Sequence, residues 1–178
     1  PTEALFGVRD AAGLRHVRSF KEDGEVRHEF QLTDVSDLLV LEFLRDVGKY
    51  VTINVSPRHL RAHGFSERLL ALMASHEVGP GQLRMEVTEG ALLENPEQVQ
   101  ICLAQLRAAG VQTLLDDFGT GFSSLSYLHR FPLHGLKIDR SFTMRLADDP
   151  GGATLVKAMV DLAHEFGLEA VAEAVEDA

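Results

Sequence analysis

Seven polar residues of this sequence each lie at the end of a short apolar segment or directly after it. They are Asn54, Glu86, Asp116, Asp117, Lys137, Asp139 and Glu173. The steps from Asn54 to Glu86, Asp116, Lys137 and Glu173 are 32, 30, 21 and 36 residues, about one strand–helix unit each. In a parallel α/β fold all strand carboxyl ends emerge on one face, so we expect these side chains to converge on one cleft. Solvated loop residues are the alternative, but they would not explain five successive strand ends.

The types of these side chains indicate a site for hard divalent cations. Carboxylate and amide oxygens, without a cluster of Cys and His, suit Mg²⁺ or Mn²⁺. The neighbouring carboxylates of Asp116 and Asp117 could bind two ions about 3.5–4 Å apart, an arrangement that supports phosphoester hydrolysis. Lys137 would then polarise a water or hold a phosphate oxygen, and its alternative is an ordinary surface lysine.

A glycine-containing segment, 117–124, begins at the second of the paired aspartates. It contains Gly119 and Gly121, but it lacks the third glycine of a dinucleotide-binding loop and the Lys-Ser/Thr pair of a P-loop. We therefore interpret it as a lid or positioning loop beside the carboxylates rather than as a phosphate cradle.

Thiol and imidazole ligands are sparse. Cys102 is the single cysteine, so it cannot form an internal disulfide, and its apolar helical surroundings favour core packing. His59 and His63 are four residues apart on a possible helix, but no third ligand lies nearby in the sequence. We interpret them as surface histidines rather than as a zinc site.

The polar residues need a scaffold of strands that alternate with helices. Short β-branched or apolar runs predict strands over 50–55, 83–87, 111–116, 136–139 and 168–172. Apolar periodicity predicts helices over 65–76, 96–109, 123–129 and 154–166. This alternation is typical of a parallel sheet with helical crossovers.

Capping and breaking residues mark the ends of the predicted helices. Asn95 is expected to cap the 96–109 helix, with Pro96 at its first position. Gly110 and Gly167 follow two helices as C-cap glycines, and 79–81 ends the 65–76 helix.

The first 48 residues give a weaker pattern. Asp23-Gly24 predicts a turn, 30–39 is mixed, and 38–47 is predicted to be helical. The sequence contains no low-complexity segment, linker or solenoid repeat, and 178 residues suffice for one domain with a core.

Charge and composition restrict the classes of partner. The chain has 17 Lys and Arg against 27 Asp and Glu, a formal net charge of −10, with 45% hydrophobic residues. This balance argues against binding double-stranded nucleic acid or an anionic membrane through basic residues. It permits a small anionic ligand, because bound metal ions supply local positive charge.

The single cysteine fits a reducing cytoplasm, so we expect a cytoplasmic location for this sequence. It has no apolar run of about 18 residues, and its first residues form no signal peptide. We expect no direct membrane insertion of this segment, and it could be the cytoplasmic domain of a larger signalling protein.

Six ordered motifs resemble those of the EAL-domain family, the cyclic-di-GMP phosphodiesterases. They are Glu3-Ala4-Leu5, Asn54-Val55-Ser56-Pro57, Glu86-Val87-Thr88-Glu89, the run from Asp116 to Leu125, Lys137-Ile138-Asp139-Arg140-Ser141-Phe142 and Ala172-Glu173-Ala174-Val175-Glu176. The resemblance implies a (β/α)₈ TIM-like barrel with one antiparallel strand, incomplete in this chain. It implies one EAL-type domain over 1–178, with an N-terminal strand and the C-terminal strand region missing.

The same resemblance implies metal-dependent hydrolysis of cyclic di-GMP to linear pGpG in bacterial second-messenger signalling. It assigns Glu3, Asn54, Glu86 and Asp116 to one Mg²⁺ or Mn²⁺ ion, and Asp116, Asp117 and Glu173 to a second ion and the water. By the same resemblance Lys137 contacts the attacking water, and Asp117 and Glu173 take part in catalysis. Glu89 holds the loop that contains Gly119 and Gly121. Asp139 lies at the substrate mouth, and the 118–125 segment couples the site to a homodimer partner.

The chain departs from the family at one substrate contact. The family usually has Glu-Ala-Leu-Leu-Arg, whereas here Leu5 is followed by Phe6 and Gly7. Arg9 is the candidate that replaces this arginine in binding a substrate phosphate.

Two other functions remain open at this point. A catalytically weak or inactive EAL domain would act as a cyclic-di-GMP receptor or a protein-interaction module. A glycosidase would also use paired carboxylates on a similar barrel, but it does not explain Asn54, Lys137 or the adjacent Asp116 and Asp117.

Overall fold

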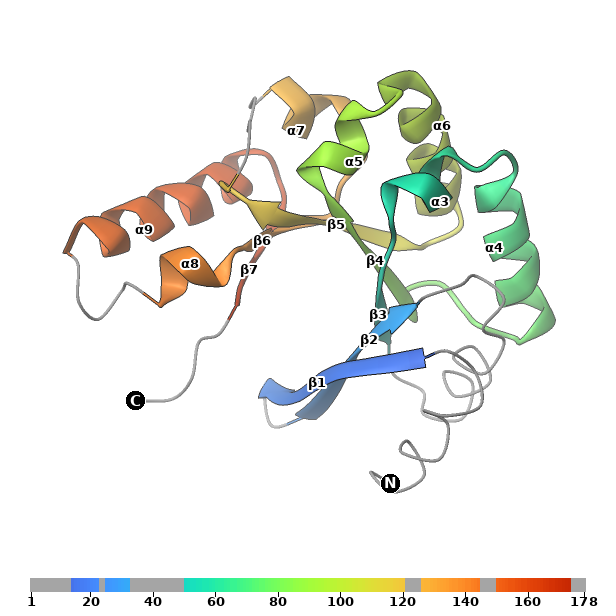
Figure 1. Cartoon of the computed structure of the whole chain (residues 1–178), viewed down its shortest axis with the longest axis horizontal. Helices are drawn as coiled ribbons and strands as arrows, with labels where there is room; N and C mark the ends of the chain where they lie inside the picture. Colours follow the sequence, from blue (N-terminus) through green and yellow to red (C-terminus); the bar gives the residue numbers. More distant parts are fainter. Residues whose placement is uncertain (1–13, 23–24, 33–49, 121–125, 145–149, 174–178) are drawn as a thin grey trace.

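The computed structural model describes residues 14–22, 25–32, 50–120, 126–144 and 150–173. A seven-stranded sheet runs through it, with the strands in sequence order from β1 to β7 (Figure 1). The strands are β1 Leu14–Glu22, β2 Glu25–Leu32, β3 Val51–Asn54, β4 Leu83–Thr88, β5 Gln112–Phe118, β6 Gly135–Ile138 and β7 Glu169–Ala172.

The sheet is parallel except at one end. β1 pairs antiparallel with β2, and every later neighbour pair from β2 to β7 is parallel. Strands that follow one another in space as they do in sequence are the pattern of a (β/α)₈ barrel, of which the described strands form an incomplete part. The predicted α/β fold with one antiparallel strand is therefore confirmed.

Helices connect the parallel strands from β3 to β7 and cover one face of the sheet (Figure 1). They are α3 Pro57–Arg61, α4 Phe65–Ser75, α5 Glu89–Leu93, α6 Pro96–Ala108, α7 Ser126–Arg130, α8 Arg140–Thr143 and α9 Pro150–Glu165. The long helices α4, α6 and α9 were predicted, although α9 begins four residues before the predicted start. The short helices α3, α5 and α8 were not predicted, because four or five residues are too few to show an apolar period.

Asn95 is the N-cap residue of α6 and Pro96 lies at its start, as predicted, but two other details of the helices differ from expectation. Asn95 adopts a left-handed conformation with φ 63°, and its side chain forms no capping hydrogen bond. Its carbonyl instead accepts a hydrogen bond of 3.1 Å from Val99 N. His63 lies beyond the end of α3, so it does not share that helix with His59.

The glycines that follow α6 and α9 match the prediction. Gly110 has φ 85° and Gly167 has φ 68°. Both residues therefore have the left-handed conformation that glycine commonly adopts directly after a helix. A Cβ atom at Gly110 would also collide with Pro80 of the β4 approach, so glycine is needed there for packing as well.

The N-terminal hairpin of β1 and β2 was not predicted. Glu22 of β1 pairs with Glu25 of β2, and the predicted Asp23-Gly24 turn between them lies outside the described residues. The helix predicted over 38–47 also lies outside them. Within the described part of the chain, no helix is long and apolar enough to cross a bilayer.

Alternation along the strands separates an apolar face from a polar face. On β4, Met85 and Val87 are fully buried in the core that the helices cover, whereas Glu86 between them points to the other face. On β6, Leu136 and Ile138 join the same core and Lys137 points away from it. Cys102 is buried in this core, as predicted.

Candidate functional site

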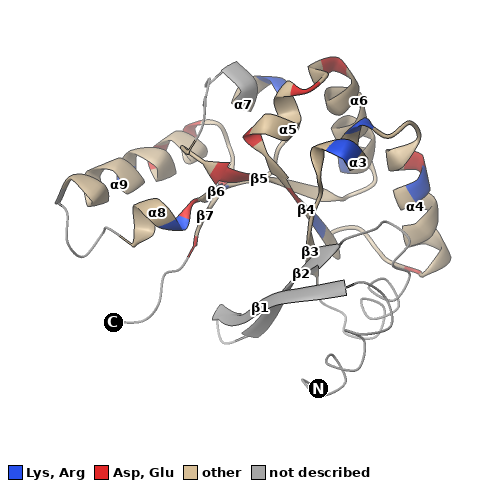
Figure 2. Ribbon diagram, viewed as in Figure 1, with Lys and Arg blue, Asp and Glu red and all other residues tan. Residues whose placement is uncertain are grey.

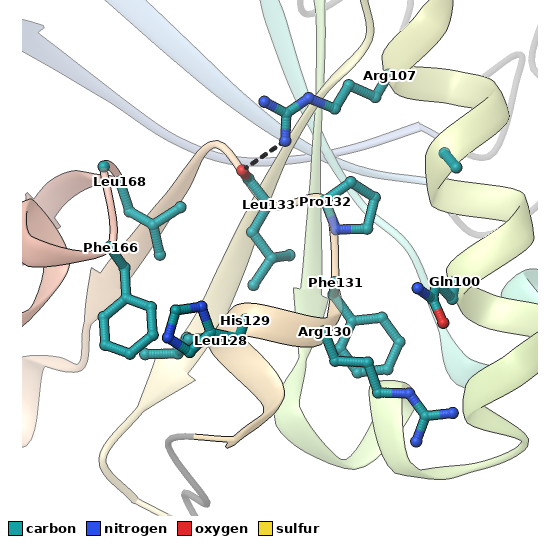
Figure 3. A pocket seen from close by; sticks show the side chains of 12 residues that line it. Gln100, Arg107, Leu128, His129, Arg130, Phe131, Pro132, Leu133, Phe166 and Leu168 are labelled. Carbon is teal, nitrogen blue, oxygen red and sulfur yellow. Dashed lines mark hydrogen bonds between the residues drawn. The ribbon is translucent and has the colours of Figure 1, made fainter.

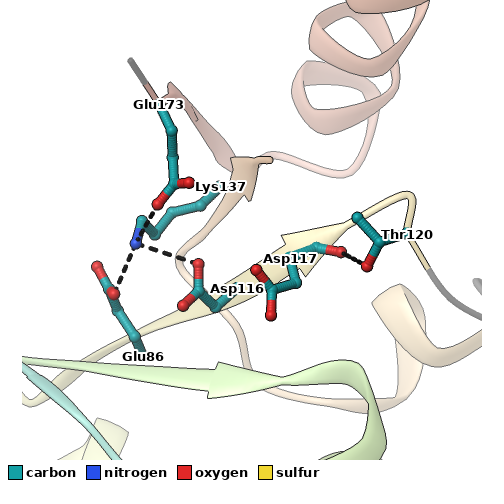
Figure 4. A network of polar contacts seen from close by, with 6 residues as sticks. All are labelled: Glu86, Asp116, Asp117, Thr120, Lys137 and Glu173. Carbon is teal, nitrogen blue, oxygen red and sulfur yellow. Dashed lines mark hydrogen bonds and ion pairs between the residues drawn. The ribbon is translucent and has the colours of Figure 1, made fainter. Parts of the chain in front are cut away.

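Lys137 lies among three carboxylates, as Figure 4 shows. Its Nζ atom donates a hydrogen bond of 2.6 Å to Oε2 of Glu86. The same atom is 3.0 Å from Oε1 of Glu173 and 3.1 Å from Oδ1 of Asp116. We call these four residues the Lys137 cluster.

Four neighbouring strands bring the Lys137 cluster together. Glu86 lies on β4, Asp116 on β5 and Lys137 on β6, while Glu173 directly follows β7. The backbone N–H of Glu173 donates a 3.2 Å hydrogen bond to the carbonyl of Ile138, which ties this residue to β6. Side chains far apart in sequence thus meet at the carboxyl ends of the strands.

Asn54 lies next to the Lys137 cluster in the sheet. It ends β3 and pairs in register with Glu86 of β4. The next residue, Val55, donates a 2.9 Å hydrogen bond from its N–H to the carbonyl of Glu86. The half-buried Asn54 therefore stands at the strand end beside Glu86, as the spacing predicted.

The Lys137 cluster is buried and rich in acidic groups. The side chains of Lys137 and Glu86 are each 5% exposed. Burial opposes the charge on Lys137, but attraction to Glu86 and Asp116, the hydrogen bond with Glu86 and attraction to Glu173 together raise the pKa of Lys137 above its ordinary value. Three acidic groups against one basic group leave negative charge in excess, which favours the binding of a cation.

A β-bulge explains how two adjacent aspartates serve one site. Leu115 and Phe118 of β5 pair with Leu136 and Ile138 of β6, so β5 has one extra residue between these pairs. Asp117 lies in this bulge with φ 57°, a left-handed conformation. In a regular strand adjacent side chains point to opposite faces, whereas a bulge redirects one of them. Figure 4 shows the two carboxylates side by side.

The surroundings of Asp117 disfavour its charged form. Burial, followed by the negative charges of Asp116, Asp139 and Glu173, raises the pKa of Asp117. Its carbonyl accepts a hydrogen bond of 2.8 Å from Oγ1 of Thr120, which closes the turn after the bulge. A carboxylate in this negative environment gains most from a nearby divalent cation.

The donor set fits a hard metal ion in chemistry. Oδ1 of Asp116 is buried and forms no hydrogen bond within the described residues, although Lys137 lies at ion-pair distance. A buried carboxylate oxygen with unused acceptor capacity is the kind of ligand that Mg²⁺ or Mn²⁺ binds. In this arrangement the ammonium group of Lys137 lies between the carboxylates. The described residues contain no group of three His, Cys, Asp or Glu side chains in a geometry that could hold a metal ion.

Glu89 is bonded to the loop that follows the bulge. The N–H of Gly119 donates a hydrogen bond of 3.3 Å to Oε1 of Glu89. Gly119 has φ 94°, and a Cβ atom there would lie 2.7 Å from Cε of Met159 and 3.1 Å from Cε2 of Phe142. Both the conformation and the packing therefore require glycine at this position.

Asp139 directly precedes α8, and its side chain caps the start of the helix. Its Oδ1 atom accepts a hydrogen bond of 2.9 Å from the N–H of Ser141. This hydrogen bond is the main cause that lowers the pKa of Asp139. Asp139 is predicted to contact substrate, and the structure shows that its carboxylate also caps α8.

Thr143 supports Glu173 and was not predicted. Its Oγ1 atom donates a hydrogen bond of 2.6 Å to the carbonyl of Glu173, so α8 fixes the backbone of a Lys137-cluster residue. Asp139 is of a residue type favoured at helix N-caps, and this signal could have indicated α8. The predicted site residues Glu3, Arg9 and Gly121 lie outside the described residues, as does most of the 118–125 segment.

Comparisons with known proteins agree on one family. A family model described as the EAL domain matches residues 26–178. MucR of Pseudomonas aeruginosa, named a bifunctional diguanylate cyclase/cyclic di-GMP phosphodiesterase, is 39% identical over 126 residues. The match covers 71% of this chain but 18% of MucR, so the chain spans about a fifth of this relative's length.

Solved structures share the fold. The crystal structure of the EAL domain of Mycobacterium smegmatis DcpA matches with a TM-score of 0.80 and 34% identity, covering 94% of this chain and 81% of that domain. The structure of the PaMucR phosphodiesterase in complex with c-di-GMP matches with a TM-score of 0.70 and 35% identity, covering 79% of this chain and 65% of that one.

Proposed function

The chain belongs to the EAL-domain family, and on this premise we propose that it hydrolyses cyclic di-GMP to linear pGpG with Mg²⁺ or Mn²⁺. The observation that carries the proposal is the Lys137 cluster at the carboxyl ends of β4 to β7. A phosphodiester that carries negative charge needs positive charge to approach this acidic site. Bound cations together with Lys137 would supply it.

Five described residues would hold the metal ions. Asn54, Glu86 and Asp116 would bind one ion, with Glu3 as a further ligand, and Asp116, Asp117 and Glu173 would bind the other. When bound, the ions neutralise charge on the phosphate and make water a stronger nucleophile. The bulge at Asp117 supports this assignment, because it presents two carboxylates from adjacent positions.

The protein's own groups orient the water and move its proton. Lys137 keeps its charge in the buried site, so it would donate a hydrogen bond that holds the attacking water in line with the phosphate. Glu173 would accept the proton of that water. Within the described residues no Ser, Cys or His belongs to the Lys137 cluster, and Cys102 is buried on α6. Direct attack by water without a covalent intermediate is therefore the pathway that we propose.

Substrate and partner would be held by the elements around the Lys137 cluster. Asp139 and Arg9 would contact the substrate. Glu89, through Gly119, would position the loop, and the 118–125 segment would contact the second copy in a homodimer. We propose a cytoplasmic setting, in which the cyclic dinucleotide is the signal that this domain removes.

Product analysis tests the function directly. The purified chain is incubated with cyclic di-GMP in Mg²⁺, in Mn²⁺ and in chelator, and the nucleotides are separated by chromatography. We expect pGpG to form with either ion and not in chelator. Binding of cyclic di-GMP without any linear product would identify a receptor, and the absence of both binding and product would contradict membership of either functional class.

A further inference from the structure

A cavity lies between α6, the end of α7 and the turn from α9 to β7 (Figure 3). Its volume is about 380 Å³, within the range of about 300–1,000 Å³ that is common for small-molecule sites. None of the residues that line it belongs to the Lys137 cluster. The cavity is thus separate from the proposed catalytic site.

The floor of the cavity is part of the folded core. It consists of Leu128, Phe131, Leu133 and Leu168, which are all less than 8% exposed. These side chains are held by packing on their far side, so the cavity does not depend on a ligand for its shape.

The rim of the cavity is cationic in a chain of net charge −10. Arg107, His129 and Arg130 line it, and no acidic side chain is among the described lining residues. Arg130 is paired with Glu97 at 2.7 Å, outside the lining, so its charge is already compensated. Arg107 is therefore the cation that a ligand would meet.

Arg107 is oriented but not neutralised. One of its N–H groups donates a hydrogen bond of 3.3 Å to the carbonyl of Leu133, which Figure 3 shows at the edge of the cavity. Within the described residues it forms no ion pair, so further guanidinium donors remain for an anion. A guanidinium with free donors binds carboxylate or phosphate well because of its planar donor geometry.

Flat surfaces form the wall opposite α6. The rings of His129 and Phe166 are in contact, with centroids 4.4 Å apart and planes at 58°. Pro132, which also lines the cavity, adds a second flat surface. Such surfaces favour a planar ring in the ligand over a flexible chain.

From these features we propose that the cavity binds a small anionic molecule in which a planar ring carries a phosphate or carboxylate group. The anion would bind to Arg107, and the ring would lie against the apolar floor between His129, Phe166 and Pro132. The proposal does not depend on the proposed hydrolysis, because it concerns other residues and is tested by binding.

Phenyl phosphate and benzoate are suitable probes, since each joins a ring to one of the two anions. Each is titrated into the isotopically labelled chain in chelator, which removes metal ions from the Lys137 cluster, and backbone amide shifts are followed by nuclear magnetic resonance. We expect saturable shifts at Gln100, Leu133 and Gly167, with phenol and inorganic phosphate binding more weakly. The tighter of the two probes identifies the anionic group.

Two variants test the site from different sides. Arg107→Gln should weaken binding about tenfold or more, because it removes a charge-assisted contact. Ala104→Leu places a larger side chain at an exposed helical position of the lining and should block the cavity while α6 stays folded. Lys157→Gln is the control, since it removes one positive charge from α9 outside the cavity and should change the affinity less than twofold.

Three results would overturn the proposal. They are the absence of shifts at the lining residues at millimolar probe, equal affinity for phenol and phenyl phosphate, and equal weakening by Arg107→Gln and Lys157→Gln. If the chain binds the probes but does not hydrolyse cyclic di-GMP, only the proposed function is contradicted. If it hydrolyses cyclic di-GMP but does not bind the probes, only this inference is contradicted.

Discussion

At the scale of single residues, one extra position in β5 decides which groups face the site. The bulge at Asp117 lets two neighbouring carboxylates lie on one face, which a regular strand does not allow. The sequence shows the pair of aspartates but not the bulge, because the left-handed φ of Asp117 depends on pairing with β6. Types and spacing were therefore enough to predict the candidate residues, while their arrangement required the sheet.

Glu86 should be a direct ligand of a metal ion. Glu86→Gln keeps an oxygen that accepts the hydrogen bond of Lys137, so the fold should remain, but the carboxylate charge is lost. Since even the partners of metal ligands contribute about 10–100-fold to affinity, we expect Mg²⁺ or Mn²⁺ binding to weaken at least tenfold in calorimetry. Glu94→Gln, which alters an exposed pair with Arg61, is the control. Unchanged affinity in Glu86→Gln would remove this residue from the ligand set.

Lys137 should stabilise the protein most when no metal is present. In Lys137→Met the three carboxylates lose their shared cation, and breaking a buried ion pair typically costs about 3–5 kcal/mol of unfolding free energy. Mg²⁺ should restore part of this loss, because it supplies the missing positive charge. Urea unfolding of wild type and variant, with and without Mg²⁺, measures both effects. Equal stability of the two proteins in chelator would show that the ion pairs contribute nothing.

At the scale of elements, the chain positions the site through short connections that leave little trace in the sequence. The four-residue helix α8 holds Glu173 through Thr143, and Glu89 at the start of α5 binds the loop at Gly119. β3 to β7 were predictable from their β-branched and apolar runs. β1 was not, because charged and polar residues alternate irregularly through Leu14–Glu22. Its place depends on pairing with β2 rather than on an apolar pattern.

Gly119 should tolerate no side chain. Gly119→Ala combines a left-handed φ with contacts to Met159 and Phe142, so we expect a loss of about 1–3 kcal/mol in thermal or urea unfolding. Gly90→Ala on α5 is the matched control, because a Cβ atom there meets nothing within 4 Å and φ is ordinary. Similar stabilities of the two variants would show that the loop relaxes around the methyl group.

At the scale of the whole molecule, the carboxyl ends of the parallel strands hold the candidate site, and contacts near their amino ends stabilise the sheet. The carboxyl ends carry the Lys137 cluster, whereas His134 at the start of β6 joins β6 to β5. The order of the strands was predictable in outline from the recurring strand–helix spacing. The cavity beside Arg107 was not, because its residues come from three segments that carry no common motif.

His134 should make stability depend on pH. Its Nδ1 atom accepts a hydrogen bond from the N–H of Thr113, and burial, followed by the charges of Arg107 and Arg84, lowers the pKa of His134. The unfolded chain therefore takes up this proton first, and the contribution to stability is full above about pH 6.5 and is lost as the pH falls. His134→Asn keeps an acceptor without the titration. Urea unfolding at pH 7.5 and 5.5 should show a smaller loss in the variant, and an equal loss would assign the pH dependence to other groups.

The role of Lys137 in turnover tests the account most directly. Lys137→Met and the control Lys157→Met are assayed with cyclic di-GMP in Mg²⁺, after circular dichroism has shown that both are folded. We predict that Lys137→Met still binds the substrate but forms pGpG about 100-fold or more slowly, since a preorganised donor in a buried site is removed, while Lys157→Met keeps the wild-type rate. A wild-type rate of pGpG formation in Lys137→Met would contradict the assignment of the Lys137 cluster as the catalytic centre.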